Sequence, residues 1–216
     1  MNYTTVIFDL DGTLLNTIED LSDSTNYVLS THGLPKRSQK EVTSFVGNGV
    51  RLLIERAVPT GTSKETTDAV FKEFQSYYRE HMKDKTRPYA EIIELLEELK
   101  KRQIKTAIVS NKFDAAVKQL KEDYFDGLIT EAIGESPTVP KKPAPDSVFT
   151  ALKQLGSSLD SCLYVGDSDV DILTAKNANV TSVGVTWGFR SRECLQLAGA
   201  NHIIDHPLEL LNLLKE

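Results

Sequence analysis

Short apolar segments alternate with longer amphipathic segments along most of this chain. Residues 3–10 are β-branched, aromatic and aliphatic, too few for a helix, and the turn pair Asp11-Gly12 ends them, so they predict a strand. Beyond residue 88, amphipathic and short apolar segments follow each other repeatedly. We predict helices at 89–102, 113–123, 145–155 and 169–178, and strands at 104–109, 127–130, 161–165 and 181–186. This rhythm is typical of parallel strands joined by crossover helices.

Residues 16–84 show helical spacing only. Ile18, Leu21, Thr25, Val28 and Leu29 recur at helical intervals before the break at 33–35, and further helices are predicted at 38–46, 49–58 and 63–82. The first strand cannot pair its backbone groups alone, so it must join the later strands in one sheet. The sequence therefore predicts an α/β fold: a doubly wound, Rossmann-like parallel sheet built from residues 1–15 and 85–216, with a helical domain inserted at 16–84.

The composition and net charge of the chain argue against several classes of function. The chain has 216 residues, 40% of them hydrophobic, and a formal net charge of −6. These values suit a globular protein and disfavour duplex binding, which needs a concentrated basic face. No apolar run is long enough to span a membrane. Cys162 and Cys194 form no C-x-x-C pair, and the histidines lack ligand spacing, so no zinc site is indicated. We expect a cytoplasmic protein, a monomer or weak homodimer, with no nucleic-acid or membrane partner.

Polar and charged residues stand where the predicted strands end. Because the carboxyl ends of strands in an open α/β sheet meet at one edge, where ligands bind, we expect these side chains to converge. Asp9 and Asp11 end the first strand and lie on one side if the strand geometry persists. The other residues are Ser110 and Asn111 after the second strand, Lys142 in a proline-rich loop after the third, and Asp167 and Asp171 after the fourth.

Crowded carboxylates indicate a bound cation. They repel each other unless a cation neutralises them or one acid stays protonated. An all-oxygen set without histidine or cysteine favours Mg²⁺, which also bridges protein carboxylates to phosphate oxygens. Phosphoryl transfer needs an in-line nucleophile, neutralised charge and a proton for the leaving oxygen. Asp9, Asp11, Lys142 and the metal ion together supply these.

The four segments resemble, in order, the four motifs of the haloacid dehalogenase superfamily. Taken singly, each has a common explanation: an Asp-Gly turn, a strand-end serine, a solvated lysine or a helix-capping acid. The specificity comes from the whole set in the right order. The matching segments are Asp9-x-Asp11-Gly12-Thr13, Ser110-Asn111, Lys142-Pro143 and Gly166-Asp167-Ser168-x-x-Asp171.

The resemblance implies a role for each residue. Asp9 would be the nucleophile and Asp11 the general acid and then the general base, while Ser110 and Lys142 would hold the phosphoryl group. The implied Mg²⁺ ligands are Asp9, Asp11 through its carbonyl, Asp167 and, directly or through water, Asp171.

The helical insertion resembles the mobile cap of the subfamily that includes phosphoglycolate phosphatases and β-phosphoglucomutases. The Gly47-Asn48-Gly49 turn, Ser110-Asn111-Lys112 and the tail at 203–211 are more similar to the phosphatase branch. Two positions depart from the pattern: the residues after Tyr89 lack the expected proline and glycine, and Asp169 adds an acid. The substrate-binding candidates are Thr13, Asn111, Lys112, Gly47, Gly49 and Arg51, the last as a cation for a second acidic group of the substrate.

The expected function is that of a Mg²⁺-dependent phosphatase, which hydrolyses a small, phosphoglycolate-like phosphate monoester through an aspartyl-phosphate intermediate. A β-phosphoglucomutase-like sugar-phosphate mutase remains an alternative, because the core motifs serve both reactions. A noncatalytic phosphometabolite-binding protein is less supported, since both Asp9 and Asp11 are present. Dehalogenation is disfavoured because the related dehalogenases lack the acid that stands here as Asp11. Arg51 and Lys112 are also typical of solvated surfaces.

Overall fold

The computed structural model describes residues 3–214, and the chain divides into two compact units. One unit consists of the chain up to Leu15 and from Pro88 onward, and the other is Asn16–Arg87. The chain crosses between them at β2 (Leu15–Asn16) and β3 (Arg87–Pro88), which pair in a two-stranded sheet. Within the described residues, no helix is both long and apolar enough to cross a membrane.

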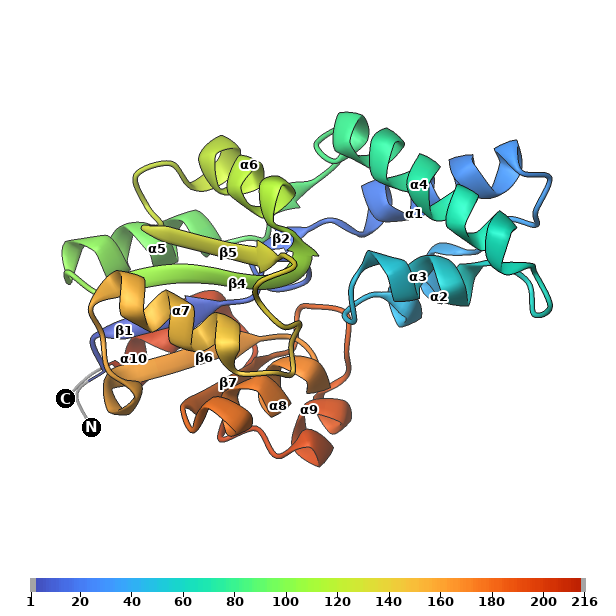
Figure 1. Ribbon diagram of the computed structural model, residues 1–216. Helices are drawn as coiled ribbons and strands as arrows, with labels where there is room; N and C mark the ends of the chain where they lie inside the picture. The colour runs from blue at the N-terminus through green and yellow to red at the C-terminus, as the bar shows by residue number, and fades with distance from the viewer. Residues whose placement is uncertain (1–2, 215–216) are drawn as a thin grey trace. The chain divides into compact units, whose positions relative to one another are not determined.

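The first unit is built on a six-stranded sheet with the order β5-β4-β1-β6-β7-β8 (Figure 1). All of its described strand pairs are parallel. The central strand is β1 (Thr5–Phe8), in which Thr5 is opposite both Lys105 and Cys162. The expectation that the first strand completes the sheet is therefore confirmed. The other strands are β4 (Lys105–Phe113), β5 (Glu131–Glu135), β6 (Cys162–Gly166), β7 (Thr181–Val185) and β8 (His202–Ile204).

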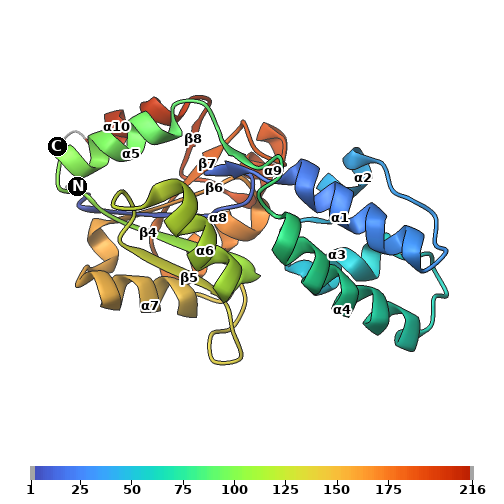
Figure 2. The same ribbon diagram turned by 90° about the horizontal axis from the view of Figure 1, so that it is seen from above.

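Helices cover both faces of this sheet, which makes it doubly wound as predicted. Helix α7 lies on one face, and α5 and α10 lie on the other (Figure 2). The apolar side of α7 meets the strands in a core that includes Ile7, Val109, Val148 and Tyr164. The helices are α5 (Ile92–Lys101), α6 (Asp114–Phe125), α7 (Asp146–Leu155), α8 (Asp169–Ala178), α9 (Arg192–Ala198) and α10 (Leu210–Leu213), with 3₁₀ turns at Leu159–Ser161 and Pro207–Glu209.

Two predicted strands differ from the observed ones. Residues 127–130 were expected to form a strand, but Gly127 has a φ of 69°, and Leu128 and Ile129 donate their backbone N–H groups to Phe125. The apolar character of Ile129 reflects burial in this turn, and pairing with β4 begins only at Glu131. Conversely, β4 continues past the predicted end at residue 109 as far as Phe113.

The second unit consists of four helices, α1 (Ile18–Thr31), α2 (Gln39–Phe45), α3 (Val50–Ala57) and α4 (Lys64–His81). Two of them begin at serine caps. Ser38 and Glu41 form a capping box at α2, and the Ser63 hydroxyl accepts a hydrogen bond from the Thr66 backbone at α4. The helices enclose a small apolar core of Val28, Leu29, Val42, Leu53, Ile54, Val70, Phe74 and Tyr78.

Candidate active site

A tight turn follows β1 and carries the first two acids. The Asp9 N–H still donates to the Val165 carbonyl, so Asp9 continues the ladder with β6. The chain then folds back, and the N–H groups of Thr13, Leu14 and Leu15 all point to the Leu10 carbonyl. Gly12 has a φ of 90°, and a Cβ there would collide with the Asp167 carboxylate. Only glycine fits this position without strain, because the backbone is left-handed and the neighbouring acid is close.

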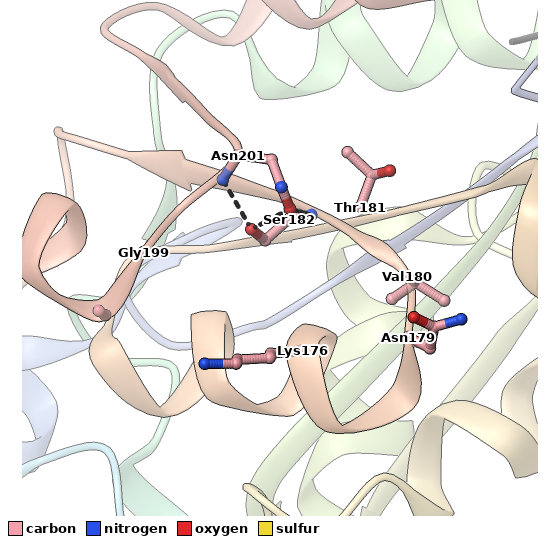
Figure 3. Close-up of a pocket in the computed structure, with 8 residues that line it drawn as sticks. Lys176, Asn179, Val180, Thr181, Ser182, Gly199 and Asn201 are labelled. Carbon is pink, nitrogen blue, oxygen red and sulfur yellow. Dashed lines mark hydrogen bonds between the residues drawn. The ribbon is translucent and has the colours of Figure 1, made fainter.

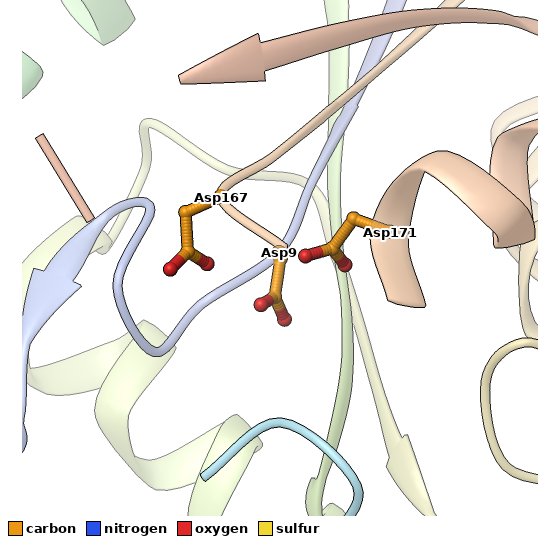
Figure 4. Close-up of side chains that lie close together, drawn as sticks. All are labelled: Asp9, Asp167 and Asp171. Carbon is orange, nitrogen blue, oxygen red and sulfur yellow. The ribbon is translucent and has the colours of Figure 1, made fainter. Parts of the chain in front are cut away.

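Three buried carboxylates meet at this edge of the sheet. Asp9, Asp167 and Asp171 each place one oxygen within 4.8 Å of the others (Figure 4). Burial, and then the charge of Asp171, raises the pKa of Asp9 to about 7, although Lys142 opposes the shift. Burial, and then the charges of Asp171 and Asp9, raises the pKa of Asp167 well above its usual range. The cluster therefore resists carrying three negative charges without a cation.

Lys142 supplies one positive charge to the cluster. Its Nζ lies 2.8 Å from Asp9 Oδ1, 2.7 Å from Asp171 Oδ1 and 3.2 Å from the Val109 carbonyl oxygen. Burial acts to lower the pKa of this ammonium, but Asp171 and Asp9 outweigh it and hold the pKa well above its usual range. One ammonium cannot neutralise three carboxylates, so the all-oxygen set fits a divalent hard cation such as Mg²⁺.

Asp167 and Asp171 occupy different environments. Asp167 Oδ2 accepts from the Phe189 N–H at 2.6 Å, and Asp167 Oδ1 accepts from the Thr13 hydroxyl at 3.3 Å. Asp171 Oδ2 accepts from the backbone and the hydroxyl of Ser168, at 3.1 and 2.6 Å, in a capping box that begins α8. Asp171 Oδ1 faces Lys142. Because Asp171 is already paired with the Lys142 ammonium, whereas the donors to Asp167 are neutral, the geometry favours an orienting role for Asp171 over direct metal ligation.

Two other predicted residues, Asn111 and Thr13, make hydrogen bonds within the site. The Asn111 side chain accepts from the Lys142 N–H at 2.8 Å and donates to the Lys142 carbonyl at 3.1 Å, so it holds the backbone of that lysine. The Thr13 hydroxyl is directed to Asp167. These contacts arise because the extended end of β4 and the turn after β1 pack against neighbouring loops, and the substrate-binding role of both residues stays a prediction.

Asp11 and Lys112 form an ion pair. The Lys112 Nζ lies 2.9 Å from Asp11 Oδ1 and 3.3 Å from Asp11 Oδ2. The Lys112 side chain is 1% exposed and that of Asp11 is 14% exposed, so the acid is the more accessible partner. Ser110, at the same strand end, is buried, and its hydroxyl accepts from the Lys112 N–H. Lys112 is therefore a buried partner of Asp11 and not a solvated side chain.

Gly47, Gly49 and Arg51 belong to the second unit. Both glycines have positive φ, 117° and 87°, and Arg56 steadies their turn by donating to the Phe45 carbonyl and to Asn48. The Arg51 guanidinium donates to Glu55 at 2.6 Å and to Asp68 at 2.5 Å. Two carboxylates of its own unit thus already neutralise Arg51, which weakens the expectation that it binds a substrate carboxylate.

The loop at 186–191 contributes contacts that the sequence did not suggest. Besides the Phe189 N–H on Asp167, the Trp187 indole donates to the Thr13 carbonyl at 3.0 Å. A Cβ on Gly188 would collide with Asp167 and with the Gly12 carbonyl. The Trp187-Gly188 pair, directly after a strand end, is the only sequence signal that could have marked this loop.

A separate polar cavity of about 380 Å³ lies at the opposite edge of the sheet, where β7 begins (Figure 3). Its walls include Lys176, Asn179, Thr181 and Asn201. The Asn201 side chain accepts from the backbone and the hydroxyl of Ser182, which closes the loop before β8. None of the predicted site residues lines this cavity, so it is distinct from the acidic cluster.

Comparison with known proteins identifies the family. The model of the haloacid dehalogenase-like hydrolases matches residues 6–185, which include every acid and lysine of the cluster. The chain belongs to the haloacid dehalogenase-like hydrolases. A phosphoglycolate phosphatase of Agrobacterium fabrum is 34% identical over 195 residues, which are 88% of this chain and 84% of that protein.

Two further relatives span almost the whole chain. A candidate pyrophosphatase, PpaX, of Caldanaerobacter subterraneus is 33% identical and covers 100% of this chain and 96% of its own length. The crystal structure of a predicted phosphoglycolate phosphatase from Haemophilus somnus superposes with a TM-score of 0.92 at 29% identity, covering 100% of this chain and 99% of that chain. Among the haloacid dehalogenase-like hydrolases, this chain falls in the phosphoglycolate phosphatase branch and is a phosphatase, a hydrolase of phosphoric monoesters.

Proposed function

We propose that this protein is a Mg²⁺-dependent phosphatase that hydrolyses a small, phosphoglycolate-like phosphate monoester through an aspartyl phosphate on Asp9. The single observation that carries the proposal is the position of Asp9. It is the last ladder residue of the central strand and lies between the Lys142 ammonium and the Asp167 carboxylate. A nucleophilic carboxylate in this place has a cation on one side and a metal-binding acid on the other.

The protein's own residues account for both halves of the reaction. An Asp9 oxygen forms a bond to phosphorus as the ester oxygen leaves, and Asp11 gives that oxygen a proton. Asp11 then takes a proton from a water molecule, whose oxygen attacks the phosphorus and breaks the bond to Asp9. Inorganic phosphate leaves, and Asp9 and Asp11 return to their starting states. Lys142 and the Ser110 hydroxyl bind the phosphoryl oxygens in both steps.

The donor set fits a magnesium ion. Asp9, Asp167 and the Asp11 carbonyl would hold it, while Asp171 would act through Lys142 and Ser168. When bound, the ion would supply positive charge that offsets the repulsion between the nucleophile and the phosphoryl oxygens. The raised pKa values of Asp9 and Asp167 support this assignment, because burial and then the neighbouring carboxylates disfavour their charged forms, and a divalent cation would offset both effects.

The Asn16–Arg87 unit is proposed to be a cap that admits small substrates. Its support is the topology: a helical unit inserted after the first motif and joined to the core by the paired segments β2 and β3. Near the second crossing, the buried Asp20 carboxylate accepts from the backbone N–H groups of Lys85 and Thr86, at 2.8–3.1 Å, and so ties the start of α1 to the chain that leaves the unit.

The decisive experiment measures phosphate release with Mg²⁺ from 2-phosphoglycolate, β-glucose 1-phosphate, pyrophosphate and 4-nitrophenyl phosphate. We expect turnover of 2-phosphoglycolate, loss of turnover with excess chelator and its return with Mg²⁺. The pyrophosphate assay follows from the PpaX relative. Accumulation of a rearranged sugar phosphate would favour the mutase alternative, and absence of phosphate release from every ester would exclude the proposal.

A further inference from the structure

The Lys142 ammonium contacts three hydrogen-bond acceptors in the interior of the protein. Its Nζ lies 2.8 Å from Asp9 Oδ1, 2.7 Å from Asp171 Oδ1 and 3.2 Å from the Val109 carbonyl oxygen. An ammonium has three N–H groups, so these contacts determine its position. Only one of the three acceptors, Asp9, is the proposed nucleophile; the other two belong to Asp171 and Val109. Whatever fixes these two acceptors also fixes the charge that faces the phosphoryl group.

The Tyr164 hydroxyl lies close to two of these acceptors, Asp171 Oδ1 and the Val109 carbonyl oxygen. Tyr164 lies in the middle of β6 and is fully buried, and its hydroxyl lies 3.3 Å from Asp171 Oδ1 and 3.5 Å from the Val109 carbonyl oxygen. A phenol has one proton to donate, and a carboxylate is the stronger acceptor, so the bond goes to Asp171. The Lys142 Nζ is also 5.9 Å from the centre of the Tyr164 ring.

The rest of the tyrosine side chain belongs to the apolar core. Its ring packs in the cluster that contains Ile7, Ala107, Cys162 and Ala175. A phenylalanine would satisfy this packing, and burying a hydroxyl has a cost unless it is hydrogen-bonded. The hydroxyl is therefore explained by its contact with Asp171 and not by the core around it.

We propose that Tyr164 is a positioning residue, whose hydroxyl fixes Asp171 and, through Asp171, the Lys142 ammonium at the place where it meets the transferring phosphoryl group. This inference rests on the proposed phosphatase function. Contact between Lys142 and the phosphoryl group matters most while the bond to phosphorus is changing, so a displaced ammonium lowers kcat more than it changes KM.

The test compares Tyr164→Phe with Tyr3→Phe. The second variant removes another tyrosyl hydroxyl of the same unit, one that donates to Thr181 away from the acidic cluster. With 4-nitrophenyl phosphate and saturating Mg²⁺, we expect Tyr164→Phe to lower kcat by about tenfold and to leave KM within about twofold, the effect of losing one hydrogen bond to a charged group. Tyr3→Phe should keep the wild-type kcat, and both variants should unfold as the wild type does.

A double-mutant cycle separates positioning from a general structural effect. In the Lys142→Met background, Tyr164→Phe should change kcat/KM for 4-nitrophenyl phosphate by less than about twofold, because the group that it positions is gone. A wild-type kcat in Tyr164→Phe, or an equal loss in both backgrounds, would overturn the inference. Failure of the proposed function is a different result: wild-type protein that releases no phosphate from any ester.

Discussion

The acidic cluster of this protein contains more buried carboxylates than buried ammonium groups. Asp9, Asp167 and Asp171 face a single ammonium, that of Lys142. Asp11 has a lysine of its own, Lys112, and is more exposed than Asp9, Asp167 and Asp171. The different environments of these acids support the different roles proposed for them, namely nucleophile, metal ligand, orienting acid and proton carrier, although the side chains are chemically identical.

Replacement of the nucleophile should abolish turnover and spare the fold. Asp9→Asn keeps the size of the side chain but removes the nucleophilic oxygen, so we expect kcat to fall by roughly four orders of magnitude or more. The metal-free variant should unfold at or above the wild-type temperature, because a carboxylate that is costly to bury has been removed. Phosphate release and thermal unfolding measure the two effects, with the exposed Asp146→Asn as control. Turnover near the wild-type level would rule out the Asp9 phosphate.

Metal binding should depend on pH in a direction set by Asp9. Its pKa in the metal-free protein is raised to about 7, so below that pH Mg²⁺ must displace a proton. We expect Mg²⁺ affinity to weaken by up to about tenfold per pH unit below neutrality. A folded-state pKa above the unfolded value also stabilises the metal-free protein at low pH, and that stabilisation is lost as the pH rises from about 4 to about 7.

Thermal unfolding with and without Mg²⁺ measures both effects. As Asp9 titrates, the metal-free protein should lose stability between pH 5 and pH 8. The stabilisation by a fixed Mg²⁺ concentration should be larger at pH 8 than at pH 6, by about 1.4 kcal/mol for each tenfold gain in affinity. Asp9→Asn serves as the comparison, since it cannot titrate. A Mg²⁺ effect that is the same at both pH values would contradict the assignment of Asp9 as a ligand.

At the scale of elements, the site is held by loops that follow three neighbouring parallel strands. The loop after β7 donates the Phe189 N–H to Asp167, and its Trp187 indole binds the turn after β1. Gly188 lies where these loops meet, and any side chain there would enter the space of Asp167 and Gly12. The loop therefore fixes the orientation of the proposed metal ligand through backbone atoms.

Gly188→Ala should weaken Mg²⁺ binding by more than about tenfold, because the added methyl group displaces Asp167. Calorimetric titration with Mg²⁺ measures the affinity without relying on activity. The control is Gly199→Ala: Gly199 has a φ of 86° but no atom within 4 Å of the new Cβ, so that variant should lose about 1 kcal/mol of stability and keep its Mg²⁺ affinity. Equal Mg²⁺ affinity in both variants would show that the loop does not control Asp167.

The secondary structure was most predictable where a segment shows a periodic pattern that fits only one type of element. The helix at 169–178 was predicted with the bounds of α8, and its capping box explains the sharp start. The predicted strand at 127–130 was wrong because a short apolar segment can bury itself in a turn as well as in a strand. The extension of β4 to Phe113 was also missed, because its last residues are polar side chains buried by the site itself.

For the whole molecule, the proposed cap leads to a preference for small substrates. A unit that closes over bound substrate excludes bulk water and leaves little room for a polypeptide leaving group. We expect free phosphoserine to be hydrolysed at least about a hundredfold faster, in kcat/KM, than a phosphoserine peptide. The two share one leaving oxygen, but free phosphoserine also carries a charged amine and carboxylate, so N-acetylphosphoserine methylamide serves as the small substrate matched to the peptide in charge. Equal rates would mean that Asn16–Arg87 does not restrict access.

The order of the four motifs, the insertion of a helical block and the placement of the first strand in the sheet can all be predicted from the sequence. Each follows from local periodicity or from the need of every strand to pair its backbone. Which residues meet depends on the folded chain: Asn111 holds Lys142, Lys112 pairs with Asp11, and the Tyr164 hydroxyl contacts Asp171. These contacts join residues from 7 to 101 positions apart in sequence. They arise from strand order and loop packing, and no local pattern of residues encodes either.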